Sequence, residues 1–123
     1  MRVRAARGAI VVGEDSSERL LGATGRLLDA LIKQNGVVME DLVSILFTVT
    51  DDLRSAFPAE AARRMGLGTV PLMCAREIPV AGSMPSVVRV LVHFHSERAL
   101  GEIAHVYLDG AESLRDDRDP ERP

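Results

Sequence analysis

The chain has 123 residues, of which 46% are hydrophobic and 27% charged, with a net charge of −3 at pH 7. This length suits a single domain, and the one cysteine, Cys74, excludes an internal disulfide framework and fits a reducing compartment. The acidic balance, the 3% aromatic content and the short apolar runs argue against nucleic-acid binding and membrane spans, so we expect a cytoplasmic globular domain without a secretion signal.

The first half of the sequence predicts a strand, a long helix and a second strand. Residues 2–12 end in β-branched residues, as strands do. Leucine and isoleucine then recur at helical spacing up to the stop signal Asn35-Gly36, and Asp15, three residues before Glu18, predicts a capping box at the start of this helix. Residues 43–50 alternate between apolar and polar side chains, which predicts a strand.

The second half predicts one short helix and three further strands. Pro58 suits the first turn of a helix that Gly66 ends, and strands are expected near 69–78, 86–95 and 104–109. This order predicts an α+β fold with helices on one face of the sheet. Strand 86–95 is apolar on both faces, so we expect the uncovered face to meet another copy of the chain.

The end of the chain differs in character from the rest. Residues 116–123 are charged, contain two prolines and offer nothing to bury. We therefore expect a disordered acidic tail there, and a single domain over residues 1–115.

Two arginines occupy unusual positions in the predicted strands. Arg89 lies in the middle of a strand that is apolar on both faces, so its charge must meet an anion, either a buried carboxylate of the chain or an anionic ligand. Arg7 likewise has small apolar neighbours on its face of the first strand. Because the planar guanidinium binds carboxylates with paired hydrogen bonds, the two arginines predict a pocket for a molecule with more than one carboxylate.

The other chemically interesting side chains give weaker signals. Cys74 and Glu77 share a predicted strand, but strict alternation puts them on opposite faces, so one pocket could hold both only if the strand is bulged or twisted. The histidines His93, His95 and His105 are better interpreted as core or surface residues than as metal ligands. No phosphate-binding loop or catalytic-triad signature is present, which leaves chemistry on a polyanion without cofactor or metal.

Several segments together resemble one known family, the trimeric class of monofunctional chorismate mutases. The match runs in order over roughly residues 2–115. The segments that carry it are RAARGA (Arg4–Ala9), FPAEAAR (Phe57–Arg63), VPLMCARE (Val70–Glu77), the pair Arg89-Val90, and HVYL (His105–Leu108).

The resemblance implies a fold and an activity. It implies a mixed sheet with helices outside, three subunits that form a pseudo-α/β-barrel, and active sites in the clefts between subunits. The implied activity is that of an isomerase of aromatic amino acid biosynthesis, which converts chorismate to prephenate by a Claisen rearrangement. Such a homotrimer would use no cofactor and no metal.

The resemblance also implies roles for particular residues. Arg7 matches an arginine that binds a substrate carboxylate, and Arg89 matches one that contacts the ether oxygen and a carboxylate. Glu77 and Cys74 match groups near the ring hydroxyl, and Tyr107 matches a residue that helps to hold the enolpyruvyl carboxylate. These correspondences make Arg89, Glu77 and Arg7 the catalytic candidates.

Further positions are implied to line the substrate cleft. The neighbouring subunit would contribute Phe57, Ala59 and Arg63, and a C-terminal segment with Leu114 and Arg115 would close over the cleft. The matching strand adds Leu72, Met73, Ala75 and Arg76. Glu60 stands where some relatives carry lysine, so no charge contact is carried over to that position.

Two other functions remain open at this point. Small trimeric enamine/imine deaminases have a similar fold and also place an arginine in an intersubunit cleft, but they need fewer arginines because their substrates carry one carboxylate. A non-catalytic metabolite-binding trimer would bind chorismate or prephenate without consuming either. The RGA and FPAEAAR segments favour the mutase over both.

Overall fold

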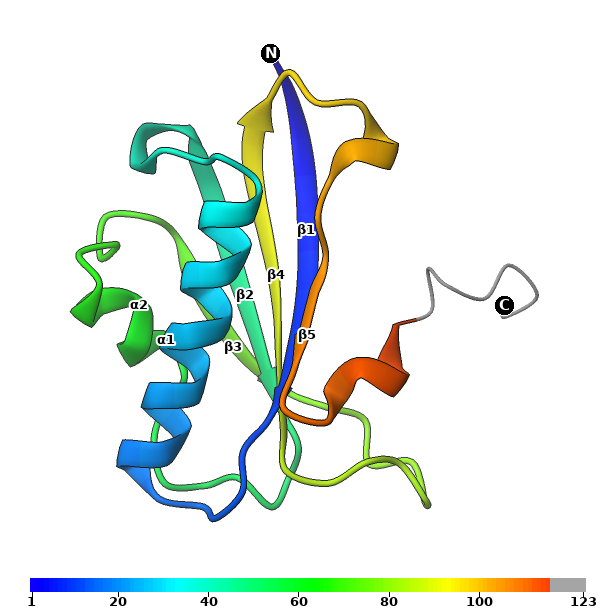
Figure 1. The fold of residues 1–123 in the computed structure, drawn as a ribbon. Helices are drawn as coiled ribbons and strands as arrows, with labels where there is room; N and C mark the ends of the chain where they lie inside the picture. Colours follow the sequence, from blue (N-terminus) through cyan, green and yellow to red (C-terminus); the bar gives the residue numbers. More distant parts are fainter. Residues whose placement is uncertain (116–123) are drawn as a thin grey trace.

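The structure is a computed structural model that describes residues 1–115; the predicted tail, 116–123, lies outside the described residues. Within 1–115, five strands form one mixed sheet in the order β3-β2-β4-β1-β5 (Figure 1). β4 pairs antiparallel with β1 and β2, whereas β5 and β3 pair parallel with β1 and β2, respectively. The strands are β1 (Arg2–Val11), β2 (Leu42–Val49), β3 (Leu72–Arg76), β4 (Val87–Ser96) and β5 (Val106–Leu108).

Two α-helices cover one face of this sheet, which confirms the predicted α+β class (Figure 1). They are α1 (Ser17–Gln34) and α2 (Ala59–Arg64). Leucines of α1 pack against apolar side chains of the strands, because helical spacing puts them on a single stripe. The largest fully buried side chains are Phe47, Phe94, Ile10, Leu20, Leu27, Leu28, Leu31 and Ile45. None of the described helices has the length and apolar character needed to cross a membrane.

Three short 3₁₀ helices complete the described chain. They are η1 (Met39–Asp41), η2 (Leu100–Glu102) and η3 (Ala111–Leu114). The last of these follows β5 directly through a turn in which both Asp109 and Gly110 have positive φ. This turn brings the end of the described chain back against β1.

The start of α1 differs from the predicted capping box. Ser16, not Asp15, is the N-cap, and its hydroxyl accepts a hydrogen bond of 3.2 Å from the backbone N–H of Arg19. The carboxylate of Asp15 instead accepts hydrogen bonds from the backbone N–H groups of Arg54 and Ser55 and from the Ser55 hydroxyl. Asp15 therefore fixes the loop that leads to α2.

Gly8 lies where β1, β5 and α1 meet most closely. A Cβ atom at this position would overlap the backbone oxygen of Val106 and would lie 2.9 Å from a methyl group of Leu27. Only a residue without a side chain lets β5 pair with β1 while α1 packs on the same strand. The glycine of the RGA segment is therefore a packing requirement.

The sheet face opposite the helices carries no other described element across most of its area (Figure 1). A register shift between Leu42 and Ser44 leaves Val43 exposed, so the simple alternation predicted for 43–50 is wrong at its first residue. From Ser44 onward, alternation places Ser44, Leu46 and Thr48 on this open face, opposite His93, Leu91 and Arg89 of β4.

Candidate active site

A shallow depression on the open face contains three of the predicted site residues. Its volume is about 360 Å³, and Arg7, Arg89 and Tyr107 line it together with Gly8, Leu46, Thr48, Val90 and Leu91. The strand register explains this grouping, because Arg7 pairs with Leu91 in β4 while Arg89 and Tyr107 both pair with Ala9 in β1. Three strands of the sheet thus present two cations and a phenol around one hollow.

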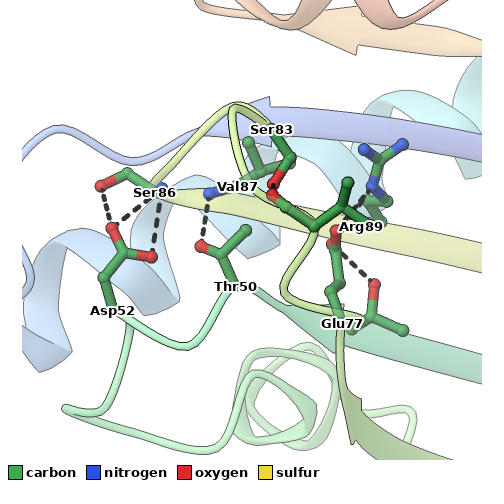
Figure 2. A network of polar contacts seen from close by, with 9 residues as sticks. Thr50, Asp52, Glu77, Ser83, Ser86, Val87 and Arg89 are labelled. Atoms are coloured by element: carbon green, nitrogen blue, oxygen red, sulfur yellow. Dashed lines mark hydrogen bonds and ion pairs between the residues drawn. The ribbon is translucent and has the colours of Figure 1, made fainter.

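Arg89 meets its anion within the chain. Its Nε atom donates to both carboxylate oxygens of Glu77, at 3.1 Å each (Figure 2). The Glu77 side chain is 17% exposed and that of Arg89 is 43% exposed, so the pair is half-buried. The sequence analysis offered either a carboxylate of the chain or an anionic ligand as the partner of Arg89, and the structure contains the carboxylate. In Figure 2 the two terminal nitrogens of Arg89 point away from Glu77.

Glu77 reaches the open face because the backbone pairing continues one residue beyond β3. The N–H of Glu77 donates to the carbonyl of Val49 at 3.0 Å, which extends the β2–β3 ladder. Thr48 lies on the neighbouring strand β2, and its hydroxyl donates to Oε2 of Glu77 at 3.0 Å. The Glu77 side chain, one residue beyond β3, therefore joins Thr48 of β2 and Arg89 of β4 in a hydrogen-bonded group of three side chains.

Arg7 projects from β1 on the other side of the hollow. Its side chain is exposed, and no described residue forms an ion pair with it. The backbone N–H of Arg7 donates to Nδ1 of His105 at 3.2 Å, just before β5 begins. This bond fixes the main chain at Arg7 while the guanidinium remains accessible.

The end of the described chain lies beside Tyr107. The guanidinium carbon of Arg115 is 5.9 Å from the centroid of the Tyr107 ring, a cation–π distance. Leu114 and Tyr107 both pack against a small buried cluster of Ala9, Val87 and Ala111. The structure thus brings Tyr107, Leu114 and Arg115 together at the edge of the hollow.

Four further predicted site residues form a second group around the β3 edge. Phe57, Cys74, Ala75 and Arg76 line a cavity of about 600 Å³ together with the loop residues 53–56. Phe57 is 75% exposed there. The register of β3 against β2 is regular, so Cys74 lies on the same side as the buried Phe47, and Glu77 lies on the opposite side. Within one chain the sheet therefore separates Cys74 from Glu77.

The other four predicted residues lie on α2 and β3 and do not line this cavity. Ala59 is buried in the core at the start of α2, and Arg63 is exposed and pairs with Glu60 at 3.2 Å. Leu72 packs partly against the core, whereas Met73 is 62% exposed and pairs with Leu46 in register. Glu60 binds the two arginines of its own helix, Arg63 and Arg64.

A polar network that the sequence analysis missed fixes the start of β4. Asp52 accepts hydrogen bonds from the backbone N–H and hydroxyl of Ser86, and the Thr50 hydroxyl accepts one of 3.0 Å from the N–H of Val87 (Figure 2). Hydrogen bonding by Thr50 and then by Ser86 lowers the pKa of Asp52. Ser86 has φ of 57°, so these contacts fix a left-handed residue three positions before Arg89.

The three histidines differ in their surroundings. His93 exchanges a hydrogen bond of 3.2 Å with Ser44, His95 is exposed, and His105 accepts from Arg7. Within residues 1–115, no three histidine, cysteine or acidic side chains are grouped closely enough to hold a metal ion. The hollow combines two arginines and a phenol, and the Glu77 carboxylate is bound to two of its lining residues, Thr48 and Arg89. Such a set can bind carboxylates and stabilise separated charge.

Comparisons with known proteins agree on one family. The family model described as "Chorismate mutase type I" matches residues 3–118. The chain is 49% identical to chorismate mutase AroH of Thermus thermophilus, over 94% of this chain and 95% of that protein. It is 36% identical to chorismate mutase AroH of Bacillus subtilis, over 95% and 93% of the respective chains. The solved structure of a chorismate mutase from Clostridium thermocellum covers 90% of this chain and 99% of its own, with a TM-score of 0.89 and 42% identity.

Proposed function

Because this chain belongs to the chorismate mutase type I family and is a chorismate mutase, we propose that Arg89, Glu77 and Arg7 carry out its conversion of chorismate to prephenate. In this rearrangement the ether C–O bond breaks as a new C–C bond forms, with no proton transfer and no covalent intermediate. The protein therefore accelerates the reaction by holding the reactive conformer and by stabilising the charge that separates in the transition state.

The observation that carries the proposal is the geometry of Arg89. Its Nε atom is held by Glu77 at 3.1 Å, while its two terminal nitrogens point away from that carboxylate (Figure 2). A fork of donors fixed in this way suits an ether oxygen that gains negative charge, together with the neighbouring carboxylate. A fixed guanidinium stabilises such a charge better than water does, because it needs no reorganisation as the bond breaks.

Glu77 has the complementary role. Positive charge grows on the ring as the enolpyruvyl group departs, and the half-buried Glu77 carboxylate provides negative charge beside the hollow. Together, interactions of this kind contribute about 3–5 kcal/mol to lowering the barrier, or a hundredfold and more in rate.

Arg7 and Tyr107 bind the carboxylates of the substrate. Both line the same hollow as Arg89, and the Arg7 side chain is exposed there. Chorismate carries two carboxylates, so two separate arginines allow both to be held at once and restrict the substrate to a conformer in which the reacting carbons are close.

The active unit is a homotrimer whose copies share each site. The open face exposes large apolar side chains, including Val3 and Met73, which a partner would cover. The cavity with Phe57 and Cys74 lies at the β3 edge, away from the hollow with Arg7 and Arg89. A neighbouring copy would therefore complete each site by placing its own β3 edge beside this hollow. We assign the chain to a single domain over 1–115 in the cytoplasm.

The test is a continuous assay of chorismate absorbance with the purified protein, with prephenate identified after acid conversion to phenylpyruvate. Wild-type protein is expected to turn over chorismate without added metal, and Arg89→Ala to lose activity while keeping the wild-type mass by light scattering. Full activity in a folded Arg89→Ala protein would overturn the assigned role of Arg89. Turnover by a stable monomer would overturn the shared site.

The two alternatives raised by the sequence are tested by two further measurements on the same purified protein. A deaminase would release ammonia from an imine acid, and a metabolite-binding trimer would gain thermal stability from chorismate without consuming it. The two relatives described above are both chorismate mutases, so they favour neither the deaminase nor the metabolite-binding trimer.

A further inference from the structure

Thr48 is a polar side chain of the hollow to which the proposed mechanism assigns no role. It lies on β2 opposite Arg89 and beside Ala75 of β3, and its hydroxyl donates to Oε2 of Glu77 at 3.0 Å. Among the described residues, the side chains that bind the Glu77 carboxylate are those of Thr48 and Arg89.

These two contacts constrain the carboxylate in different ways. Arg89 approaches with a single nitrogen that is equidistant, at 3.1 Å, from the two oxygens of Glu77. One donor placed between two oxygens leaves the carboxylate free to swing about it. The Thr48 hydroxyl binds one oxygen only, and from a different strand, so it removes this freedom.

Resting on the proposed function, we propose that Thr48 is a positioning residue for the reaction. It holds the Glu77 carboxylate, and through it the Nε edge of Arg89, in the orientation that the transition state requires. It acts through Glu77 and need not touch the reacting atoms. Because the ring charge that Glu77 stabilises exists in the transition state and not in the bound substrate, the contribution of Thr48 belongs to kcat.

The experiment compares three substitutions of this residue. Thr48→Val keeps the shape and removes the hydroxyl, and it is expected to lower kcat about tenfold with KM within about twofold of wild type. Thr48→Ser keeps the hydroxyl and should restore kcat to within about threefold of wild type. Thr48→Ala repeats the test with a smaller side chain, should valine prevent folding.

Two further measurements separate positioning from a merely structural role. In a Glu77→Ala background, Thr48→Val should cause no additional loss of kcat, because the acceptor is already absent. The dissociation constant of the product prephenate, measured by calorimetry, should differ less than twofold between Thr48→Val and wild type. Ser44→Ala is the matched control. It removes a hydroxyl from the same face of β2, but this hydroxyl is bound to His93 and not to Glu77.

The outcomes distinguish this inference from the function on which it rests. An active wild type with unchanged kcat in Thr48→Val overturns the inference and leaves the function intact. An equal loss in the Glu77→Ala background, or no rescue by serine, also overturns it. A wild type that does not convert chorismate overturns the proposed function and this inference together.

Discussion

Arg26 of α1 donates two parallel hydrogen bonds to the carboxylate of Asp109, at 2.9 and 3.1 Å. Asp109 begins the left-handed turn between β5 and η3, so this pair ties the helix layer to the segment that ends beside Tyr107. The paired geometry raises the pKa of Arg26 and lowers that of Asp109, chiefly through these hydrogen bonds. A contact on the outer surface thus orients residues at the edge of the hollow.

Removing this contact should affect substrate binding more than overall stability. Both side chains are about half-exposed, so Arg26→Gln is expected to cost no more than about 1 kcal/mol of unfolding free energy. Because Leu114 and Arg115 lie at the end of η3, which this turn orients, KM for chorismate should rise by about two- to fivefold with kcat nearly unchanged. Steady-state kinetics check this, with Lys33→Gln as a control that breaks an exposed pair within α1. Equal KM values for the two variants would contradict the prediction.

Substitution of Arg89 by lysine should be nearly as damaging as its removal. A lysine has one nitrogen, which cannot both bind Glu77 and present a separate pair of donors to the substrate. We expect kcat/KM to fall by about a hundredfold or more, with the melting temperature close to that of wild type. The chorismate assay and thermal unfolding measure the two quantities. Near-normal kcat/KM would show that a point charge suffices.

The close approach at Gly8 predicts a large loss of stability. In Gly8→Ala the new methyl group meets the carbonyl of Val106, which cannot move without breaking the β1–β5 pairing. We expect the unfolding free energy to drop by about 3 kcal/mol or the protein to fail to fold. Gly22→Ala is the control, because that exposed helix position has open space, and it should gain up to about 1 kcal/mol. Chemical denaturation distinguishes the two.

Asp52 should make stability sensitive to acid. Its pKa is lowered from the ordinary 3.8 by hydrogen bonds from Thr50 and Ser86, so its stabilising effect is present above that value and is lost as the pH falls through the lower, folded-state pKa. At pH 7, Asp52→Asn is expected to be less stable than wild type by about 1 kcal/mol. Between about pH 5 and pH 3 this difference should shrink.

Thermal unfolding across this pH range measures the difference for Asp52. The matched control is Asp51→Asn, whose side chain accepts no hydrogen bond from any described residue. A difference between wild type and Asp52→Asn that stays constant down to pH 3 would contradict the linkage.

Local sequence signals predicted the elements well and their long-range contacts poorly. Asp15 and Ser16 are adjacent and both suit an N-cap; Ser16 takes this role because Asp15 is bound to Ser55, 40 residues away, which no local pattern encodes. The partner of Asp52 is likewise remote. The exposed Val43 reflects a bulge that shifts the alternation, and periodicity alone does not reveal such a shift.

In the candidate site, too, local patterns revealed some residues and missed those that depend on remote partners. Arg89 was detectable because a charge among valines needs an anion, and the structure places Glu77 there. Thr48 gave no signal, since a threonine is ordinary in a strand and its partner Glu77 lies 29 residues away, just beyond β3. The separation of Cys74 from Glu77 followed directly from strand alternation, and the regular β2–β3 register confirms it.

The pairing of β1 with β4 also determines where the chain can change in length. Arg7 and Arg89 belong to one uninterrupted antiparallel register that runs from Arg2 to Val11, so the sheet sets their spacing. The connection at 78–85 lies outside this ladder and is mostly exposed. Residues can be gained or lost in that connection without moving either arginine, whereas one residue inserted between Val87 and Arg89 would turn the guanidinium toward the core.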